Sequence, residues 1–364
     1  MKRLAIVVVI LSLIAIGLGI CFITGTIGLK GFDAWPDQVS SRQTLSVSEL
    51  ETSEKIDFPA AQKFSLTVDK LEREFIVYRP DKLTPNQVVP VVFMYHGGSG
   101  TGDKFYKLSG WRQVADKYGL MVVFPTGVKY HVYADAPTEA VPNPPDAYET
   151  RWSSYHLGRN FNPDFPDQAP ADDVAFTRAM VRFVSQSYAV DTTRIYAAGF
   201  SNGGAMVNRL LAEASDIFAA FGSSSSGLQE GDLESALENT PDTYTPRPTA
   251  VMIGSTDTKV TAAFGVRSLP TDETAMLETS PVRMRYVDGY LSMLGLNDTY
   301  TYDQAGKLTT FTFTTEAGRP KAPPVPLKFM IVAGMDHVFP AGKNFPLVAA
   351  EVYWEFFKEY TLSE

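Results

Sequence analysis

The feature that most constrains the fold of this chain is the segment at residues 194–206, which reads RIYAAGFSNGGAM. An apolar run stops at the pentapeptide GFSNG, and apolar residues then recur at helical spacing. This pattern predicts a strand, a sharp turn and a helix, with Ser201 at the tip of the turn. The glycines two positions before and after such a serine let the strand and the helix approach each other closely. Ser201 is therefore a candidate nucleophile, and the alternative is a glycine-rich turn that only packs.

The rest of the chain alternates between strand-length and helix-length apolar patterns. Residues 64–68 and 74–78 predict an antiparallel hairpin around a short polar turn. Further strands are predicted at residues 88–95, 120–124, 217–222, 250–253 and 329–332, and helices at residues 111–118, 172–188 and 349–360. Such alternation is typical of an α/β domain with a doubly wound, mostly parallel sheet and helices on both faces.

The N-terminal region differs from the rest in composition. Residues 4–23 follow two basic residues and carry no charge, which is a length sufficient to cross a bilayer as a helix. We therefore expect residues 1–30 to form a transmembrane signal anchor or a signal peptide, residues 31–60 a polar stalk or linker, and residues 61–364 the catalytic domain. Because basic flanking residues stay in the cytoplasm, the domain is expected to be extracytoplasmic, either anchored to the membrane or secreted.

The composition excludes several classes of function. The 364 residues carry a formal net charge of −9 without a cluster of Lys and Arg, which argues against a nucleic-acid partner. The single cysteine, Cys21, lies in the N-terminal apolar segment, so the domain has no disulfide and no cysteine nucleophile. The four histidines lack metal-ligand spacing, so no metal and no cofactor is expected. Asp172 and Asp173 begin a predicted helix and fit its dipole better than a calcium site or an acid–base pair.

A serine nucleophile requires a histidine base and an acid that orients the histidine. In doubly wound hydrolases these groups follow the serine in the order acid, then histidine. His337 is the only histidine after Ser201, and it lies directly after the predicted strand at residues 329–332. Since catalytic groups gather at the carboxyl ends of parallel strands, we expect His337 to lie beside Ser201.

Asp257 is the predicted acid. It follows the predicted strand at residues 250–253 at the same edge of the sheet, where its carboxylate would accept the Nδ1 proton of His337. Asp336 is adjacent to the histidine in sequence and is poorly placed to reach its far nitrogen. Asp272 is the reserve candidate.

Two backbone N–H groups are expected to form the oxyanion hole. One belongs to Asn202, the residue after the serine, and the other to the loop after the third strand. That loop is HGGSG at residues 96–100, in which Gly98 is the first choice as donor and Ser99 the second. Glycine lets the backbone approach a substrate closely. His96 precedes the turn and is interpreted as a structural hydrogen-bonding residue.

Residues 129–171 form a Pro-rich and aromatic-rich stretch that is longer than a connector in a compact domain requires. Large aromatic side chains are costly to leave in water, so Trp152 and Tyr155 favour a substrate-facing loop over disorder. Together with Phe339, two residues after the predicted base, they are the candidates to line the substrate pocket. The alternative is an insertion that only covers the core.

Five motifs together resemble the polyhydroxybutyrate depolymerase-like and feruloyl-esterase-like α/β-hydrolases, a group similar to carbohydrate esterase family 1. The motifs are HGG at residues 96–98, DDV at 172–174, DTTRIYAAGFSNGGAM at 191–206, GSTD at 254–257 and DHVFP at 336–340. The resemblance extends over residues 64–360 and implies an α/β-hydrolase fold, in which Ser201, Asp257 and His337 match the family's triad.

Three departures from the family pattern concern the substrate and leave the triad intact. The family often has His-Gly-Thr where this chain has Ile-Gly-Ser at residues 253–255. It commonly has tryptophan where this chain has Phe339. It often has a cysteine in the oxyanion loop or near the tryptophan of the long loop, and this chain has none there.

The residues and the resemblance predict a serine esterase that hydrolyses a carboxylic ester through an acyl-enzyme. The substrate would be a feruloyl or other aryl ester, an acetylated polysaccharide or a hydroxyalkanoate ester, in polymeric or smaller form. The alternatives on the same triad are a serine peptidase and an acyltransferase. A further alternative is a non-catalytic envelope protein that keeps the hydrolase fold for binding.

Overall fold

The computed structural model of the chain describes residues 61–133, 144–228, 231–314 and 325–362. Contacts divide the chain into two units, residues 1–45 and 46–364, and every described residue belongs to the second. The anchor or signal peptide predicted at residues 1–30 and the stalk predicted at residues 31–60 lie outside the described residues. Within the described ranges, no helix is both long enough and apolar enough to cross a membrane.

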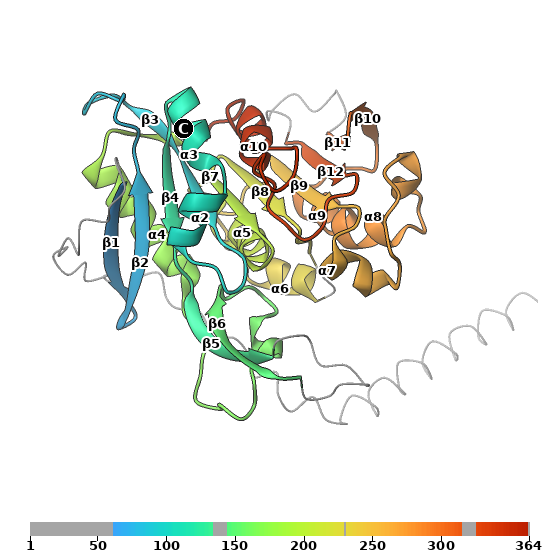
Figure 1. Cartoon of the computed structure of the whole chain (residues 1–364), viewed down its shortest axis with the longest axis horizontal. Helices are drawn as coiled ribbons and strands as arrows, with labels where there is room; N and C mark the ends of the chain where they lie inside the picture. Colours follow the sequence, from blue (N-terminus) through green and yellow to red (C-terminus); the bar gives the residue numbers. More distant parts are fainter. Residues whose placement is uncertain (1–60, 134–143, 229–230, 315–324, 363–364) are drawn as a thin grey trace, which may run out of the picture. The chain divides into compact units, whose positions relative to one another are not determined.

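A ten-stranded sheet forms the centre of the described part (Figure 1), in the order β1-β2-β4-β3-β7-β8-β9-β12-β11-β10. Its strands are β1 Ala61–Val68, β2 Leu71–Tyr78, β3 Val89–Tyr95, β4 Met121–Pro125, β7 Val190–Phe200, β8 Ala220–Ser224, β9 Thr249–Gly254, β10 Tyr300–Ala305, β11 Leu308–Phe313 and β12 Leu327–Val332. Neighbouring strands from β4 to β12 pair in parallel. The two outer pairs at each edge are antiparallel. The predicted doubly wound, mostly parallel sheet is confirmed.

The β1–β2 hairpin follows from its local sequence. Asp69 and Lys70 at its turn have φ angles of 50° and 68°. This left-handed backbone is what a two-residue turn between antiparallel strands requires. The register places Phe64 opposite Phe75, and the two rings stack with their centroids 5.6 Å apart.

Helices cover both faces of the sheet. They include α2 Gly102–Leu108, α3 Trp111–Tyr118, α4 Asp173–Ser187, α5 Asn202–Glu213 and α10 Ala349–Phe357. Successive residues of a strand point to opposite faces. On β2, Ile76 belongs to the core that includes α3 and α10, whereas the neighbouring Phe75 contacts Phe176 of α4, with ring centroids 6.3 Å apart. Helix α4 therefore lies on the face opposite α3 and α10.

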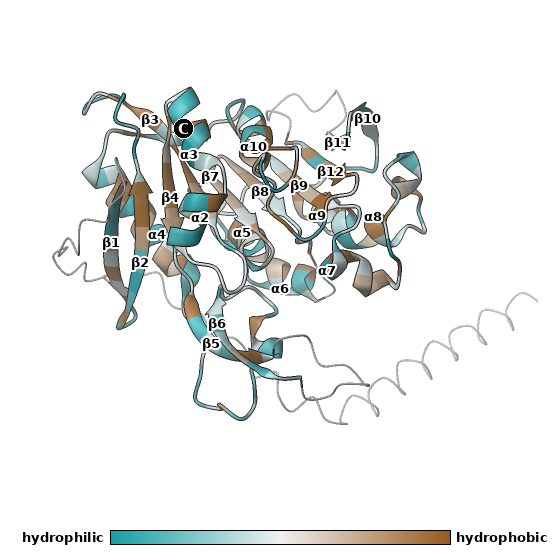
Figure 2. Ribbon diagram, viewed as in Figure 1, coloured by the Kyte–Doolittle hydropathy of each residue, from teal (hydrophilic) through white to brown (hydrophobic). Residues whose placement is uncertain are grey.

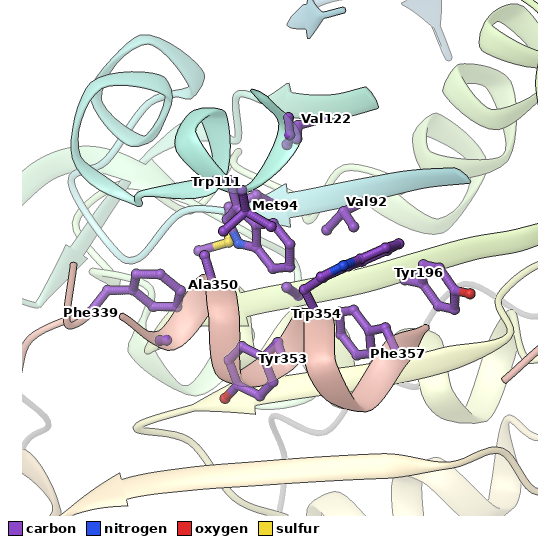
Figure 3. Close-up of a cluster of buried hydrophobic side chains, with 14 of the residues drawn as sticks. Val92, Met94, Trp111, Val122, Tyr196, Phe339, Ala350, Tyr353, Trp354 and Phe357 are labelled. Carbon is purple, nitrogen blue, oxygen red and sulfur yellow. The ribbon is translucent and has the colours of Figure 1, made fainter. Parts of the chain in front are cut away.

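Aromatic rings dominate the core between the sheet and the helices α3 and α10 (Figure 3). The ring of Phe357 stacks on Trp111 and on Tyr196, with centroids 6.3 and 5.1 Å apart. Figure 2 shows the central strands as largely hydrophobic and the outer helices as mixed. Because Tyr196 belongs to β7, this packing holds in place the strand that ends directly before Ser201.

Two regions differ from the sequence prediction. Residues 300–313, for which the sequence analysis predicts no strand, contribute β10 and β11 to the sheet, and β11 buries Phe311 and Phe313. The stretch at residues 129–171, expected to be irregular, contains a separate hairpin of β5 Val128–Tyr133 and β6 Asp146–Arg151 and the short helix η1 Leu157–Asn160. These strands alternate between inward and outward residues, a period-2 pattern that the surrounding prolines obscured.

Short helices lie between β8 and β10. They are α6 Asp232–Glu238, α7 Thr258–Thr261, η2 Ala262–Phe264, η3 Glu273–Met276, α8 Pro281–Tyr286 and α9 Asp288–Leu294. The first of the helices after β9, α7, begins directly after Asp257. It therefore starts at the carboxyl end of a parallel strand, where the catalytic groups are expected.

Candidate active site

Ser201 lies in the turn between β7 and α5. Its φ and ψ angles are 53° and −120°, a conformation that is strained for a residue with a side chain. A Cβ atom at Gly199 would lie 2.1 Å from the carbonyl oxygen of Gly203, and one at Gly203 would lie 2.2 Å from that of Tyr95. The strand and the helix therefore pack backbone against backbone, as the pentapeptide predicts, and leave the Ser201 side chain at the tip of the turn.

The side chains of Ser201, His337 and Asp257 form a continuous hydrogen-bonded chain. Ser201 Oγ lies 2.9 Å from His337 Nε2. On the other side of the ring, His337 Nδ1 lies 2.9 and 3.0 Å from the two oxygens of Asp257. Because an ionised carboxylate can only accept, Nδ1 carries the proton and Nε2 has the lone pair that can take the serine proton. The structure thus brings together the three residues that the sequence places at one edge of the sheet.

The carboxylate of Asp257 is fully buried, and hydrogen bonds compensate for its burial. Its Oδ1 accepts the backbone N–H groups of Lys259 and Val260, at 3.0 and 3.2 Å, in the first turn of α7. The same carboxylate therefore caps a helix and orients His337. This double role fixes the side chain in one position.

The other acidic candidates are engaged elsewhere. Asp336 accepts the backbone N–H groups of Thr258 and His337, at 3.1 and 2.7 Å, and these donors lower its pKa. Asp272 accepts the N–H of Thr274 at 3.1 Å and caps η3. Among the described residues, no cluster of three or more His, Cys, Asp or Glu side chains could hold a metal ion.

His96 is a structural residue at the start of the oxyanion loop. Its ring is fully buried, with Nδ1 2.7 Å from the carbonyl oxygen of Gly97 and Nε2 accepting the N–H of Gly127 at 2.9 Å. These contacts fix the neutral tautomer with its proton on Nδ1. Burial lowers the pKa of His96 to about 4. The residue is therefore part of the scaffold, as interpreted from the sequence.

The proposed oxyanion donors, Asn202 and Gly98, differ from Ser99 in their hydrogen bonding. In the part of the chain that the structure describes, the backbone N–H groups of Asn202 and Gly98 donate to no acceptor. Ser99, the second choice, donates its N–H to the carbonyl oxygen of Thr150 at 3.0 Å. This difference supports the choice of Gly98 as the second donor.

Three residues predicted to line the substrate pocket are buried. Trp152 is fully buried, and its Nε1 donates to the carbonyl oxygen of His96 at 2.8 Å. Tyr155 and Phe339 are each 7% exposed, and the ring of Phe339 lies 6.1 Å from that of Phe200. Trp152 therefore has a structural contact with the loop at residues 96–100, and the expectation that these three side chains contact a substrate stays a prediction. Large aromatic rings avoid water equally well in a core, and the sequence does not distinguish the two cases.

Phe200 is a site residue with no counterpart among the sequence predictions. Its ring lies 5.0 Å from the ring of His337. It also touches the oxyanion loop, since a Cβ atom at Gly97 would lie 3.0 Å from Phe200 Cδ1. The ring remains partly exposed and gives the site an apolar surface beside the base. Its place directly before the serine in the pentapeptide is a signal that could have identified it.

A buried polar cluster holds the chain at Ser153. The fully buried Asp173 lies 2.6 Å from Nη2 of Arg73, and its Oδ2 accepts the N–H and the hydroxyl of Ser153 at 2.7 and 2.8 Å. Arg209 of α5 donates to the carbonyl oxygen of Ser153 at 2.6 Å. Asp172 is the N-cap of α4 and Asp173 is its first residue, so both lie where the helix dipole favours a carboxylate, and Asp173 in addition pairs with the buried Arg73.

Known proteins resemble this chain in sequence over part of its length. The model of the prolyl oligopeptidase family matches residues 153–229, the segment that contains Ser201. Feruloyl esterase B of Talaromyces funiculosus is 26% identical over 156 residues, which are 43% of this chain and 36% of that protein. The poly(3-hydroxybutyrate) depolymerase of Ralstonia pickettii is 25% identical over 297 residues, which are 71% of this chain and 50% of that protein.

The comparison of structures concerns the fold. The acetyl xylan esterase from Aspergillus awamori matches with a TM-score of 0.52 at 16% identity, over 82% of this chain and 99% of that one. The chain therefore has the α/β-hydrolase fold. The predicted resemblance to feruloyl-esterase-like and polyhydroxybutyrate depolymerase-like hydrolases is confirmed. The alignments span 36% and 50% of the lengths of these two curated relatives.

Proposed function

We propose that this α/β-hydrolase, which is similar in sequence to feruloyl esterases and a polyhydroxybutyrate depolymerase, is a serine carboxylic ester hydrolase. The proposal rests on the continuous hydrogen-bonded chain from Ser201 Oγ through His337 to the buried Asp257. A serine on a strained strand-to-helix turn, joined to a histidine and an acid, is the arrangement that activates a hydroxyl for acyl transfer. The names of the curated relatives support an ester as the substrate.

The proposed reaction has two halves. Ser201 Oγ attacks the ester carbonyl while His337 Nε2 takes its proton, and the N–H groups of Asn202 and Gly98 stabilise the negative oxygen. His337 then gives the proton to the leaving alcohol, and the acyl group stays on Ser201. Water, deprotonated by His337, attacks the acyl-enzyme and releases the acid, and the proton returns to Ser201. Asp257 stabilises the imidazolium in both halves.

The proposed substrates are feruloyl or other aryl esters, acetylated polysaccharides and hydroxyalkanoate esters. Feruloyl and hydroxybutyrate esters are the substrates that the names of the relatives give for those proteins. The extracytoplasmic location, by membrane anchoring or secretion, rests on the basic start and uncharged residues 4–23 of the sequence.

The test is hydrolysis by the full-length chain of nitrophenyl acetate, methyl ferulate, acetylated xylan and polyhydroxybutyrate. Ser201→Ala is expected to abolish turnover of every ester and labelling by a fluorophosphonate, with unchanged folding by circular dichroism. Ser65→Ala on the edge strand β1 is the matched control, and it is expected to keep full activity. Equal turnover by the parent protein and Ser201→Ala would contradict the proposal.

A serine peptidase is the second candidate, because the prolyl oligopeptidase model matches the segment around Ser201. Esterases and peptidases of this fold share that turn, so the match by itself does not separate them. Nitroanilides of short peptides, assayed beside the esters, distinguish the two. Faster turnover of the amides would favour the peptidase.

A further inference from the structure

The guanidinium of Arg151 lies on the oxyanion loop. A Cβ atom built on Gly98 would lie 2.6 Å from Nη1 of Arg151 and 2.8 Å from its Cζ. The side chain therefore occupies the space that any residue other than glycine would need at position 98. A permanent positive charge thus lies beside a backbone N–H that is proposed to bind the ester oxygen.

Strand β6 fixes Arg151 in this position. The preceding residue, Thr150, accepts the backbone N–H of Ser99 at 3.0 Å, and its hydroxyl donates to the carbonyl oxygen of Gly100. These two contacts attach the end of the β5–β6 hairpin to two consecutive residues of the oxyanion loop, directly after Gly98. The cation and the oxyanion donor therefore belong to one hydrogen-bonded unit.

Protein groups use only some of the hydrogen-bond donors of the Arg151 guanidinium. Its Nη2 forms an ion pair with Glu149, while its Nε is buried and has no hydrogen-bond partner in the described part of the chain. The Arg151 side chain is 23% exposed and that of Glu149 18% exposed. Nη1, the nitrogen over Gly98, is the donor closest to the loop. The Arg151 guanidinium can therefore still donate a hydrogen bond to an anion that reaches the oxyanion loop.

We propose that Arg151 is a specificity-determining residue that binds a carboxylate carried by the ester substrate within a few bonds of the scissile carbonyl. The inference rests on the proposed function of the Ser201 site. A guanidinium binds carboxylates through charge-assisted hydrogen bonds, which are stronger than neutral ones. The chain has a net charge of −9, so an anionic substrate is repelled by the protein as a whole and needs a local cation at the site. Glu149 competes with the substrate for the same guanidinium.

The experiment compares two esters that differ in one charge. The full-length chain is assayed with 4-nitrophenyl hydrogen glutarate and with its neutral analogue, 4-nitrophenyl methyl glutarate, and the rate with Ser201→Ala is subtracted as background. The measured quantity is the ratio of kcat/KM for the anionic ester to that for the neutral ester. Arg151→Met is expected to lower this ratio on the order of 10- to 100-fold. Glu149→Gln is expected to raise it, because the competing carboxylate is gone.

Two further variants complete the design. Arg151→Lys keeps the charge but loses the planar fork, and an intermediate ratio is expected. Lys117→Met removes an exposed positive charge on α3 that pairs with Glu351, and it is expected to leave the ratio unchanged. An unchanged ratio in both Arg151→Met and Glu149→Gln, or an equal loss of both esters in Arg151→Met, overturns the inference. Turnover that survives Ser201→Ala overturns the proposed function instead.

Discussion

The side-chain amide of Asn202 pairs with both backbone groups of Trp152: its Oδ1 accepts the Trp152 N–H at 2.7 Å, and its Nδ2 donates to the carbonyl oxygen at 3.3 Å. Trp152 in turn donates its Nε1 hydrogen to the carbonyl oxygen of His96 at 2.8 Å. Asn202, the residue after Ser201, is therefore connected to His96, at the start of the proposed oxyanion loop, through one buried tryptophan. Both proposed oxyanion donors depend on this connection for their relative position.

Asn202→Ala is expected to lower kcat for nitrophenyl acetate by about 10- to 100-fold, although it keeps the backbone N–H. Loss of the two hydrogen bonds releases the start of α5, and small displacements of an oxyanion donor are costly. The matched control is Asn208→Ala on the same helix, which removes the acceptor of the Tyr290 hydroxyl. It is expected to lower the free energy of unfolding with little change in kcat. Similar kcat values for the two variants would show that the Asn202 side chain does not position the donor.

The identity of the acid gives a second prediction. Asp257→Asn is expected to lower kcat by roughly 10³- to 10⁴-fold, because the amide can donate to His337 Nδ1 and stabilise the wrong tautomer. Asp336→Asn is the control, since the Asp336 carboxylate accepts the backbone N–H groups of Thr258 and His337. A loss of less than about 10-fold is expected there. Steady-state kinetics measures both variants. A larger loss of kcat in Asp336→Asn than in Asp257→Asn would mean that Asp336 is the acid.

Buried His96 predicts how stability depends on pH. Burial lowers its pKa from 6.5 to about 4, so between these values the unfolded chain binds a proton that the folded chain does not. The free energy of unfolding therefore falls as the pH drops through this window. The decrease due to His96 is on the order of 3 kcal/mol in total. His96→Gln lacks this pH-dependent loss. The variant should therefore be less stable than the parent at pH 7, and the difference between their free energies of unfolding, measured in urea, should become smaller from pH 7 to pH 4. Parallel stability curves would disprove the depressed pKa.

The hydrogen-bonded arrangement of Ser201, His337 and Asp257 could be predicted from the sequence because each of the three residues follows a recognisable strand. Ser201 is marked by the spacing of its glycines, His337 is the only histidine downstream of it, and Asp257 follows an apolar run. The parallel sheet then brings the ends of those strands together, and the structure places the three side chains within hydrogen-bonding distance. Local sequence patterns, together with the rule that functional groups gather at the carboxyl ends of parallel strands, were sufficient to predict this part of the site.

The supporting contacts could not be predicted, because they join residues that are distant in sequence and that no recognisable motif links to each other. Arg73 and Asp173 are 100 positions apart, and neither lies in a pattern that indicates a partner. Trp152 could equally have faced a substrate, and only the three-dimensional packing shows that it faces His96. The neighbours against which such side chains pack determine where they point, and a single sequence does not reveal these neighbours.

The buried pair of Asp173 and Arg73 leads to the last prediction. Arg73 is 3% exposed and Asp173 is fully buried, so Asp173→Ala leaves an uncompensated cation and should lower the free energy of unfolding by about 3–5 kcal/mol. The adjacent Asp172→Ala removes only the N-cap of α4 and should cost about 1 kcal/mol. Urea unfolding of the two variants measures this difference between neighbouring carboxylates. Equal losses in the free energy of unfolding would mean that the ion pair with Arg73 does not stabilise the protein beyond the effect of a carboxylate at the start of α4. That effect is the one the sequence alone suggested.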